Sequence, residues 1–266
     1  MDATQTGQVN RSAADVYEEF FVPALFQDWA GPVSEAAGLK PGARVLDVAC
    51  GTGVLAREAL KRIEPGGSLV GLDINDGMLA VARRRTPDID WRQGPAESLP
   101  FDDSSFDAVV SQFGLMFFED RVAALKEMWR VLRPGGRLAV AVWDSLDNTP
   151  GYAAVTELLQ RMFGDDVADG MRAPFNLGDT GVLMPLLAAA GIQEAKLQTT
   201  DGTARFPSIE AWVHTDVKGW TLEDMIDDAQ YEALLEAALT ELKSFQQGDG
   251  RVAFTAPAHI VSAVKT

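Results

Sequence analysis

The residues with the clearest chemical potential lie in one short stretch, residues 44–56, which reads RVLDVACGTGVLA. The apolar run 44–48 is typical of a buried parallel strand, and small residues at 49–53 lead into a helix. A strand that passes through glycines into a helix leaves outward-pointing backbone N–H groups that can bind a ligand. The GTGVLA segment also matches the GxGxxG/A dinucleotide pattern, which is a weak signal when it stands alone.

Two carboxylates indicate which ligand charge this turn favours. Asp47 lies four residues before Gly51, where it would repel a pyrophosphate at the helix start. At about 4–6 Å, like charges in a partly buried site cost a few kcal/mol. Asp73 ends the next predicted strand, 20 residues after Gly53, where a carboxylate can accept hydrogen bonds from ribose hydroxyls. These residues favour a nucleoside with a cationic tail, and S-adenosylmethionine fits because it carries a sulfonium and an ammonium.

Alternating strands and helices are expected to position these residues. The predicted strands are 44–48, 68–73, 89–93, 106–111 and 137–143, and helices are predicted from residue 54 and over 76–85 and 120–132. This alternation predicts an α/β fold with a doubly wound parallel sheet, which binds ligands beyond the carboxyl ends of its strands. An aromatic helix, broken near Pro23, is predicted over residues 12–29.

The second half of the chain has a looser pattern. It predicts a helix at 152–163, a loop at 165–178, a helix at 179–190, a strand at 195–200 and helices within 207–250. Strand-like pieces follow at 251–265, with a bulge or break at Pro257. We expect one domain, residues 1–266, with an N-terminal helical segment at 1–39 and a cofactor-binding core at 40–145. Residues 146–178 and 207–250 are expected to form a helical cap over a substrate pocket.

Composition limits the kinds of molecule that the chain is expected to bind. The net charge of −16 disfavours nucleic acid and membrane surfaces, and no apolar run reaches the roughly 18 residues of a membrane span. No signal peptide is recognisable, and the single cysteine, Cys50, excludes an internal disulfide framework and a cysteine-based zinc site. We expect a cytoplasmic protein with a small-molecule substrate and no metal, and the oligomeric state stays open between monomer and homodimer.

Four motifs carry a resemblance to a known family: VLDVACGTG, VGLDIN, GPAESLPFDDSSFDAVVS and EMWRVLRPGGRLAVAVW. Together they resemble the class I S-adenosylmethionine-dependent methyltransferases, in particular the small-molecule branch with the ubiquinone/menaquinone-type enzymes. The resemblance is strong over residues 40–145. It implies a Rossmann-like seven-stranded sheet whose last strand is antiparallel, with helical additions before strand one and after strands five and six.

The resemblance also implies a set of cofactor-binding residues. The methionine and sulfonium side is expected to be lined by Asp47, Ala49, Gly51 and Gly53, and the methionine portion also by Ser111, Gln112 and Phe113. Asp73 is expected to hold the ribose, Ile74 and Met78 to flank the adenine, and Ala96 and Glu97 to meet its edge. Pro95 stands where related sequences usually carry an acidic residue that binds the adenine amino group. Glu97 or a backbone carbonyl must then replace that contact, or affinity is lower.

The sequence does not assign a catalytic residue. His214, Tyr17 and Gln112 are weak candidates, and His259 is weaker still, because a lone histidine more often has a structural role. Aromatic residues such as Trp212, Trp220 and Phe117 either form a cap core or line an apolar acceptor pocket.

The predicted function is S-adenosylmethionine-dependent methyl transfer to a small, apolar or aromatic molecule, with O-, C- and N-methylation left open. An NAD-type oxidoreductase and a non-catalytic cofactor-binding protein are the alternatives. Asp47 and the lack of a Tyr-x-x-x-Lys pair disfavour the oxidoreductase.

Overall fold

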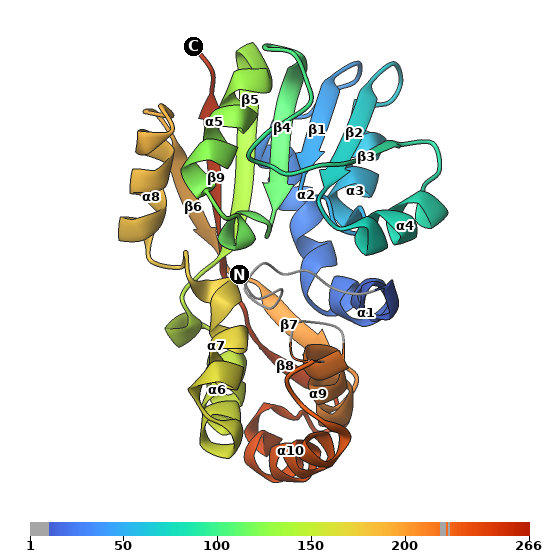
Figure 1. Cartoon of the computed structure of the whole chain (residues 1–266), viewed down its shortest axis with the longest axis vertical. Coiled ribbons are helices and arrows are strands. Elements are labelled where there is room, and N and C mark those ends of the chain that lie inside the picture. Colours follow the sequence, from blue (N-terminus) through green and yellow to red (C-terminus); the bar gives the residue numbers. More distant parts are fainter. Residues whose placement is uncertain (1–10, 219–221, 223) are drawn as a thin grey trace.

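A seven-stranded sheet forms the centre of the molecule (Figure 1). The structure is a computed structural model, and it describes residues 11–218, 222 and 224–266; Trp220 lies outside the described residues. The strand order is β3-β2-β1-β4-β5-β9-β6. Strands β1 to β5 are parallel, and β9 pairs antiparallel with both β5 and β6, so the predicted architecture is confirmed. The bounds are β1 Arg44–Val48, β2 Ser68–Asp73, β3 Asp90–Gln93, β4 Phe106–Gln112, β5 Leu132–Trp143, β6 Lys196–Thr200 and β9 Ala258–Val264.

Helices cover both faces of this sheet, which explains why its central strands are apolar on both sides. Helices α2 (Gln27–Ala36) and α3 (Val54–Ile63) pack together on one face, and α5 (Arg121–Val131) and α8 (Thr180–Ala189) on the opposite face (Figure 1). Helix α4 (Asp76–Arg85) follows β2. Val45, Leu46 and Val48 of β1 are fully buried, as a strand covered on both faces requires. Because these parallel strands are buried side by side, their carboxyl ends lie at the same edge of the sheet.

The N-terminal helix is not broken at Pro23, contrary to the prediction. Helix α1 (Arg11–Val16) continues as a π-helical run, Tyr17–Phe26, and then as α2. Pro23 lies inside the π-helical run. The wider turn of a π-helix reorganises the hydrogen bonds around a residue that has no N–H to donate, so the chain stays helical there. The helix also extends beyond Trp29 to Ala36. Its first turns lie toward the carboxyl ends of the strands (Figure 1).

A second group of elements lies beyond the carboxyl ends of the strands, and we call it the cap (Figure 1). It comprises α6 (Pro150–Phe163), α7 (Asp165–Arg172), β7 (Thr203–Phe206), α9 (Ile209–Lys218), α10 (Asp228–Glu241) and β8 (Val252–Thr255). Strands β7 and β8 pair antiparallel in a small separate sheet. Strand β8 lies in the strand-like segment predicted at 251–265, whereas β7 and its pairing with β8 were not predicted. The predicted loop at 165–178 is wrong over α7, whose Val167, Ala168 and Met171 repeat at helical spacing and are buried.

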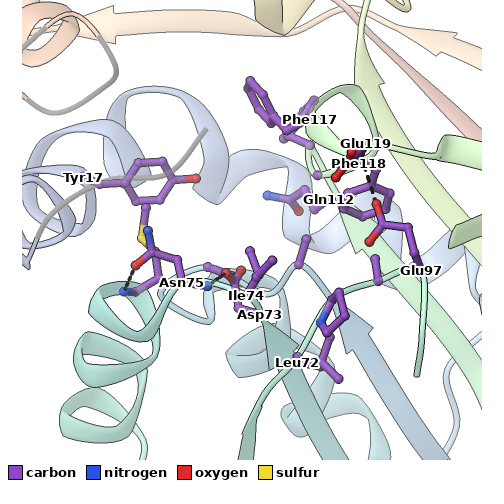
Figure 2. Close-up of a pocket in the computed structure, with 18 residues that line it drawn as sticks. Tyr17, Leu72, Asp73, Ile74, Asn75, Glu97, Gln112, Phe117, Phe118 and Glu119 are labelled. Atoms are coloured by element: carbon purple, nitrogen blue, oxygen red, sulfur yellow. Dashed lines mark hydrogen bonds between the residues drawn. The ribbon is translucent and has the colours of Figure 1, made fainter. Parts of the chain in front are cut away.

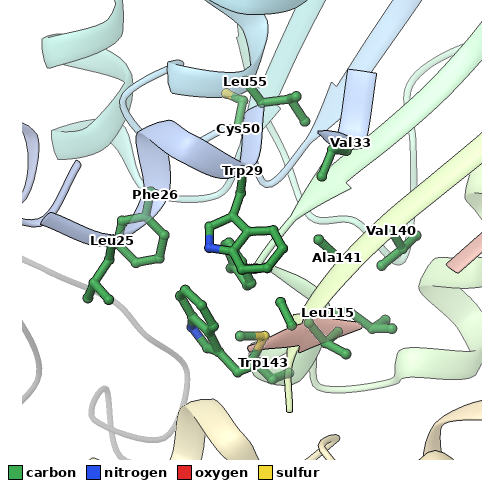
Figure 3. Packing of buried hydrophobic residues seen from close by; sticks show 14 of the residues in the cluster. Leu25, Phe26, Trp29, Val33, Cys50, Leu55, Leu115, Val140, Ala141 and Trp143 are labelled. Carbon is green, nitrogen blue, oxygen red and sulfur yellow. The ribbon is translucent and has the colours of Figure 1, made fainter. Parts of the chain in front are cut away.

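An aromatic cluster joins the N-terminal helix to the ends of β4 and β5, and Figure 3 shows three of its members. We call it the aromatic wall: Phe26, Trp29, Phe113 and Trp143. The rings of Phe113 and Trp143 stack with centroids 3.8 Å apart, and Phe26 lies 5.5 Å from Phe113. Trp29 meets both stacked rings edge-on at 6.0 Å. Contacts of this kind stabilise a cluster beyond area burial alone, so the wall fixes the N-terminal helix to the sheet.

None of the described helices combines the length and the apolar character that crossing a membrane would demand.

Candidate active site

A cavity of about 340 Å³ opens at the carboxyl ends of β1, β2 and β4 (Figure 2). Its volume lies in the range of small-molecule sites, and its position is the one that open α/β sheets use for ligands. Most of the predicted cofactor-binding residues line it: Ala49, Gly51, Asp73, Ile74, Met78, Ala96, Glu97, Gln112 and Phe113. Residues from four separate loops thus meet around one space.

Asp73 organises the floor of this cavity. Its Oδ2 accepts a hydrogen bond of 2.8 Å from the Gly51 N–H, and its Oδ1 accepts one of 2.8 Å from the Asn75 N–H. Burial raises the pKa of the Asp73 carboxyl, and the N–H groups of Asn75, Gly51 and Ile74 oppose that rise. Asn75 also caps α4, since its side chain accepts from the Met78 N–H at 3.1 Å. Asp73 therefore ties the glycine turn after β1 to the start of α4.

The glycines of the turn have different roles. A Cβ built on Gly51, whose φ is +54°, would meet no described atom within 4 Å, so the space in front of it belongs to the cavity. A Cβ on Gly53, with φ +88°, would lie 2.5 Å from the ring of Trp91. Gly53 caps α3 and does not appear among the described cavity-lining residues. The first glycine leaves room for a ligand, and the second lets the helix pack against β3.

Two further predicted residues, Asp47 and Ser111, lie inside the sheet and not on the described surface of the cavity. Asp47 is 1% exposed and Ser111 is fully buried. Burial, and next the neighbouring charge of Asp73, raise the pKa of Asp47, while the Ala56 N–H opposes the rise. Neither Asp47 oxygen reaches a hydrogen bond of good geometry with a described residue. The structure therefore gives no direct contact between Asp47 and the described surface of the cavity, contrary to the position expected from the sequence.

The loop after β3 brings Pro95, Ala96 and Glu97 to the cavity (Figure 2). Glu97 accepts a hydrogen bond of 3.1 Å from the Glu119 N–H through Oε1. Pro95 lies beside it and offers no carboxylate, so Glu97 is the acidic side chain of this loop that faces the cavity.

An ion-pair network holds the same loop against α5. Arg130 donates to the carbonyl oxygens of Leu99 and Phe101 at 3.1 and 2.8 Å and to the Glu127 carboxylate at 2.7 Å. Glu127 in turn accepts from the Leu99 N–H at 2.8 Å. Arg130 lowers the pKa of Glu127, as expected for a charge-assisted pair. These contacts thus connect the SLPFDD segment with the EMWR segment of α5, and they hold in place the loop that carries Ala96 and Glu97.

Sequence reasoning missed several residues of the cavity and gave others no cofactor role. These are Tyr17, Leu72, Asn75, Gly94, Gly114, Phe117, Phe118 and Glu119. Asn75 had a readable signal, because it immediately precedes a predicted helix with the side chain of a strong N-cap. Phe117 was expected from the sequence either in a cap core or in an acceptor pocket, and the structure places it in the lining of this cavity.

Tyr17 reaches the cavity from the N-terminal helix. Its ring stacks on Phe26 with centroids 5.1 Å apart. Burial raises the pKa of the Tyr17 hydroxyl, and the charges of Asp73 and Glu18 raise it further. The hydroxyl therefore stays protonated at neutral pH and can donate a hydrogen bond, but it is poorly suited to act as a base.

The other candidates for catalysis have distinct surroundings. Gln112 lines the cavity, and its Nε2 donates to the Phe26 carbonyl at 3.0 Å, while its buried Oε1 has no partner among the described residues. His214 lies on α9 with its ring 5.8 Å from Phe20, away from the described cavity lining.

His259 is fixed by the fold. It is 3% exposed, its Nδ1 lies 2.8 Å from Thr199 Oγ1, and its Nε2 lies 2.9 Å from the Gly178 carbonyl oxygen. Asp144 Oδ1 is 3.2 Å from the same Nε2. Both ring nitrogens are engaged by protein groups, which gives His259 a structural position between β9, β6 and the loop before α8.

The donor set of the cavity fits an adenosyl cofactor with a cationic tail. Asp73 supplies a carboxylate, the Gln112 side chain lines the same space, and Gly51 leaves open space in front of its turn. Ile74 and Met78 add apolar surface on one side. Over the described ranges, no group of three or more potential ligands is arranged to hold a metal ion.

Comparison with known proteins agrees with this geometry. The methyltransferase domain family matches residues 46–140. A demethylmenaquinone methyltransferase from Renibacterium salmoninarum is 45% identical over 147 residues, which are 55% of this chain and 61% of that protein. One from Staphylococcus carnosus is 35% identical over 188 residues, 65% of this chain and 78% of that protein.

A solved structure extends the likeness to the whole fold. The phosphoethanolamine N-methyltransferase 2 of Haemonchus contortus, in complex with S-adenosyl-L-methionine, has a TM-score of 0.62 at 19% identity. It covers 96% of this chain and 57% of its own length. At that identity the likeness concerns the fold alone.

The fold and the cavity define a Rossmann-like α/β protein with a cavity at the carboxyl ends of its parallel strands. With the family match and the relatives at 35–45% identity, the chain belongs to the class I S-adenosylmethionine-dependent methyltransferases.

Proposed function

We propose that the chain transfers a methyl group from S-adenosylmethionine to a small, mostly apolar or aromatic molecule. The single observation that carries this proposal is the cavity itself. It brings the Asp73 carboxylate, an open glycine turn and the Gln112 side chain together beside Phe113 and Phe117. The two relatives above, named as demethylmenaquinone methyltransferases, support an acceptor of quinone-like chemistry.

Each wall of the cavity has a part in this function. Asp73 would hold the ribose hydroxyls, Ile74 and Met78 would flank the base, and Glu97 would meet its edge. Gln112 would lie beside the amino-acid end. The bound cofactor supplies an electrophilic methyl group on a sulfonium. The protein must then hold acceptor, methyl and sulfur in line and keep water out, and the aromatic wall provides a water-poor boundary.

The cap is proposed to cover the acceptor. Helices α6, α7, α9 and α10 lie beyond the carboxyl ends of the strands (Figure 1). An enclosed apolar acceptor would explain why so much aromatic surface gathers between the sheet and these helices. Trp212 belongs to the interior of the cap, where its ring lies 4.6 Å from Phe254 and 5.7 Å from Phe206.

Calorimetry and a transfer assay test the proposal. We expect S-adenosylmethionine to bind in a one-to-one ratio and NAD not to bind. Labelled methyl groups from the cofactor should appear in hydroxylated naphthalenes offered as acceptors. Tight binding of NAD without binding of S-adenosylmethionine would overturn the proposal. Cofactor binding without transfer to any acceptor in a broad screen would favour a non-catalytic cofactor-binding protein.

A further inference from the structure

The described chain passes between the sheet and the cap at four places (Figure 1). It leaves the sheet after β5 and again after β6, and it returns from the cap before α8 and before β9. We call these segments the crossings, in chain order residues 144–149, 173–179, 201–202 and 256–257. A change in the orientation of the cap relative to the sheet would be taken up by the crossings, since hinge motions are absorbed at the ends of elements.

The four crossings are packed against one another. A Cβ on Gly178 would lie 2.4 Å from the carbonyl carbon of Asp144, so the first two crossings approach as closely as backbones can. The Asp144 N–H donates to the Pro257 carbonyl at 3.1 Å, and the Ala256 N–H donates to the Gly202 carbonyl at 3.0 Å. These contacts link all four crossings into one junction.

His259 lies at this junction, on β9, and is 3% exposed. Its Nε2 is 2.9 Å from the Gly178 carbonyl oxygen and 3.2 Å from Asp144 Oδ1, and its Nδ1 is 2.8 Å from Thr199 Oγ1. Both neighbours of Nε2 are acceptors, so this nitrogen carries a hydrogen, and the Thr199 hydroxyl can donate to Nδ1. One imidazole ring therefore contacts the first two crossings directly and joins the strand ends from which the other two begin and end.

Asp144 extends the contact with His259 into the first crossing. Its Oδ1 accepts from the Ser145 N–H at 2.6 Å, and its Oδ2 accepts from Asn148 Nδ2 at 3.1 Å. An ion pair also joins the cap to the N-terminal helix, between Arg205 and Asp28 at 2.9 Å, but these side chains are 59% and 73% exposed. Exposed pairs contribute little, so the buried contacts of the junction constrain the cap more strongly.

The cofactor cavity is built without the cap. All of its described lining residues lie between residues 17 and 119, and none of them belongs to a cap element. His259 is not among them either. A change at the junction can therefore move the cap while the described lining of the cofactor cavity stays as it is.

We propose that His259 is a positioning residue that fixes the orientation of the cap over the cofactor cavity. The inference rests on the proposed function, in which the cap covers the acceptor. His259 acts on the acceptor through the crossings and not through contact. Without its hydrogen bonds the cap tilts, and the acceptor loses its alignment with the methyl group while the cofactor still binds.

Pulsed electron paramagnetic resonance between two nitroxide labels tests the orientation directly. Lys126→Cys on α5 and Glu236→Cys on α10 provide exposed attachment sites on the sheet layer and on the cap, and the native Cys50 is buried. His259→Phe keeps a ring but removes both nitrogens, and it should broaden and shift the distribution of label distances. His259→Gln keeps a side-chain N–H for the Gly178 carbonyl and should restore most of the wild-type distribution. Identical distributions in the wild type and in His259→Phe would overturn the proposal.

Cofactor affinity and methyl transfer separate positioning from general stability. In His259→Phe, S-adenosylhomocysteine should bind within about twofold of the wild type, whereas methyl transfer to hydroxylated naphthalenes should fall about tenfold or more, because alignment is lost. Thr156→Val is the matched control. Thr156 is also buried, on α6 of the cap, but its hydroxyl donates to the Tyr152 carbonyl at 2.7 Å within the helix, so neither quantity should change. Equal losses of affinity and transfer in His259→Phe would mark a purely structural role and overturn the proposal.

A milder variant covers the case in which His259→Phe does not fold. Thr199→Val removes one of the three contacts of the ring and should shift the label distances in the same direction by a smaller amount. If the wild type does not bind S-adenosylmethionine, the proposed function fails, and the label distances still decide the role of His259. If it binds and transfers methyl groups, but the distances are unchanged in both variants, the assignment of His259 alone fails.

Discussion

The backbone N–H of Gly51 donates a 2.8 Å hydrogen bond to Oδ2 of Asp73, which joins the turn after β1 to the end of β2. Asp73 thereby has two tasks. It shapes the glycine turn that lines the cavity, and under the proposed function it would also accept hydrogen bonds from the ribose hydroxyls. A residue that builds the site and also contacts its contents should be sensitive to any substitution.

We predict that Asp73→Ala weakens the binding of S-adenosylmethionine by about 1–3 kcal/mol, the value of charged hydrogen bonds lost from a buried site. Calorimetry measures this change. Asp76→Ala is the control, because Asp76 is a largely exposed carboxylate three residues away, paired with Arg83 at 3.2 Å. Unchanged affinity in Asp73→Ala, or an equal loss in Asp76→Ala, would contradict the ribose role.

Cofactor binding should be linked to protons. Burial raises the pKa values of Asp47 and Asp73 above the usual 3.8. A sulfonium nearby favours the ionised carboxylates, so binding should release protons and strengthen as the pH rises through the raised pKa values. Calorimetry in two buffers of different ionisation enthalpy measures the protons released. S-adenosylhomocysteine, which lacks the sulfonium charge, should show a smaller pH dependence, and equal dependence for both molecules would argue against this coupling.

In the cofactor-free protein, the raised pKa values of Asp47 and Asp73 determine whether the free energy of unfolding rises or falls with pH. A carboxyl whose pKa is raised on folding stabilises the fold fully only below its unfolded value, here 3.8. That contribution is lost as the pH rises through the folded value. The unfolding free energy of the wild type should therefore fall as the pH rises above about pH 4. Asp47→Asn should make this fall smaller, and denaturant titrations at several pH values measure the difference.

The sheet and the cofactor motifs could be predicted because their signals are local. Residues 44–48 form a mostly apolar run, and glycines follow at 51 and 53. This pattern alone indicates a buried strand and a turn. The position of Tyr17 could not be predicted, since it depends on a helix remaining continuous through Pro23 and docking on the aromatic wall. Likewise Asp47 has the same sequence signal whether it faces a ligand or lies inside the sheet, and only packing decides between the two.

Asp216, in the cap, is a residue whose position could not be predicted from the sequence. In the segment IEAWVHTDVK an aspartate reads as a solvated side chain, because charged residues are rarely buried. Its burial follows from α9 packing against other cap elements, with Trp212 and Val213 also inside. The partners of α9 have no local signature, so the burial of Asp216 could not be inferred from the sequence.

Glu18 is predicted to fasten the N-terminal helix over the cofactor cavity. Its carboxylate accepts from Arg57 at 2.9 and 3.2 Å and lies 3.5 Å from Arg85, and Arg57 also donates to the Thr52 carbonyl. Glu18→Gln should lower the unfolding free energy by about 1–3 kcal/mol, because it leaves a partly buried arginine without its counter-charge.

The same variant should weaken cofactor binding several-fold, since Tyr17 is the preceding residue and lines the cavity. Glu19→Gln is the matched control, because Glu19 is exposed on the same helix. Denaturant titration and calorimetry give the two quantities. A loss of stability with unchanged cofactor affinity would limit Glu18 to the fold and exclude the fastening role.

The contact between Gly114 and Ala49 offers a test of how the ends of β1 and β4 are held together. A Cβ on Gly114 would lie 2.5 Å from the Cβ of Ala49, and Ala49 itself has φ +55°, a conformation that favours glycine. Gly114→Ala should therefore destabilise the protein by about 1–3 kcal/mol through overpacking and should disturb the cavity that both residues line. Ala49→Gly removes the opposing Cβ and relieves the left-handed backbone.

The double variant should recover most of the stability lost in Gly114→Ala, because the clash needs both Cβ atoms. A double-mutant cycle by denaturant titration should then give a favourable coupling of about 1 kcal/mol or more, the range for residues in contact. Cofactor affinity should follow the same order, lowest in Gly114→Ala and restored in the double variant. Additive effects of the two substitutions would show that the ends of the strands adjust independently, and that the cavity does not depend on this contact.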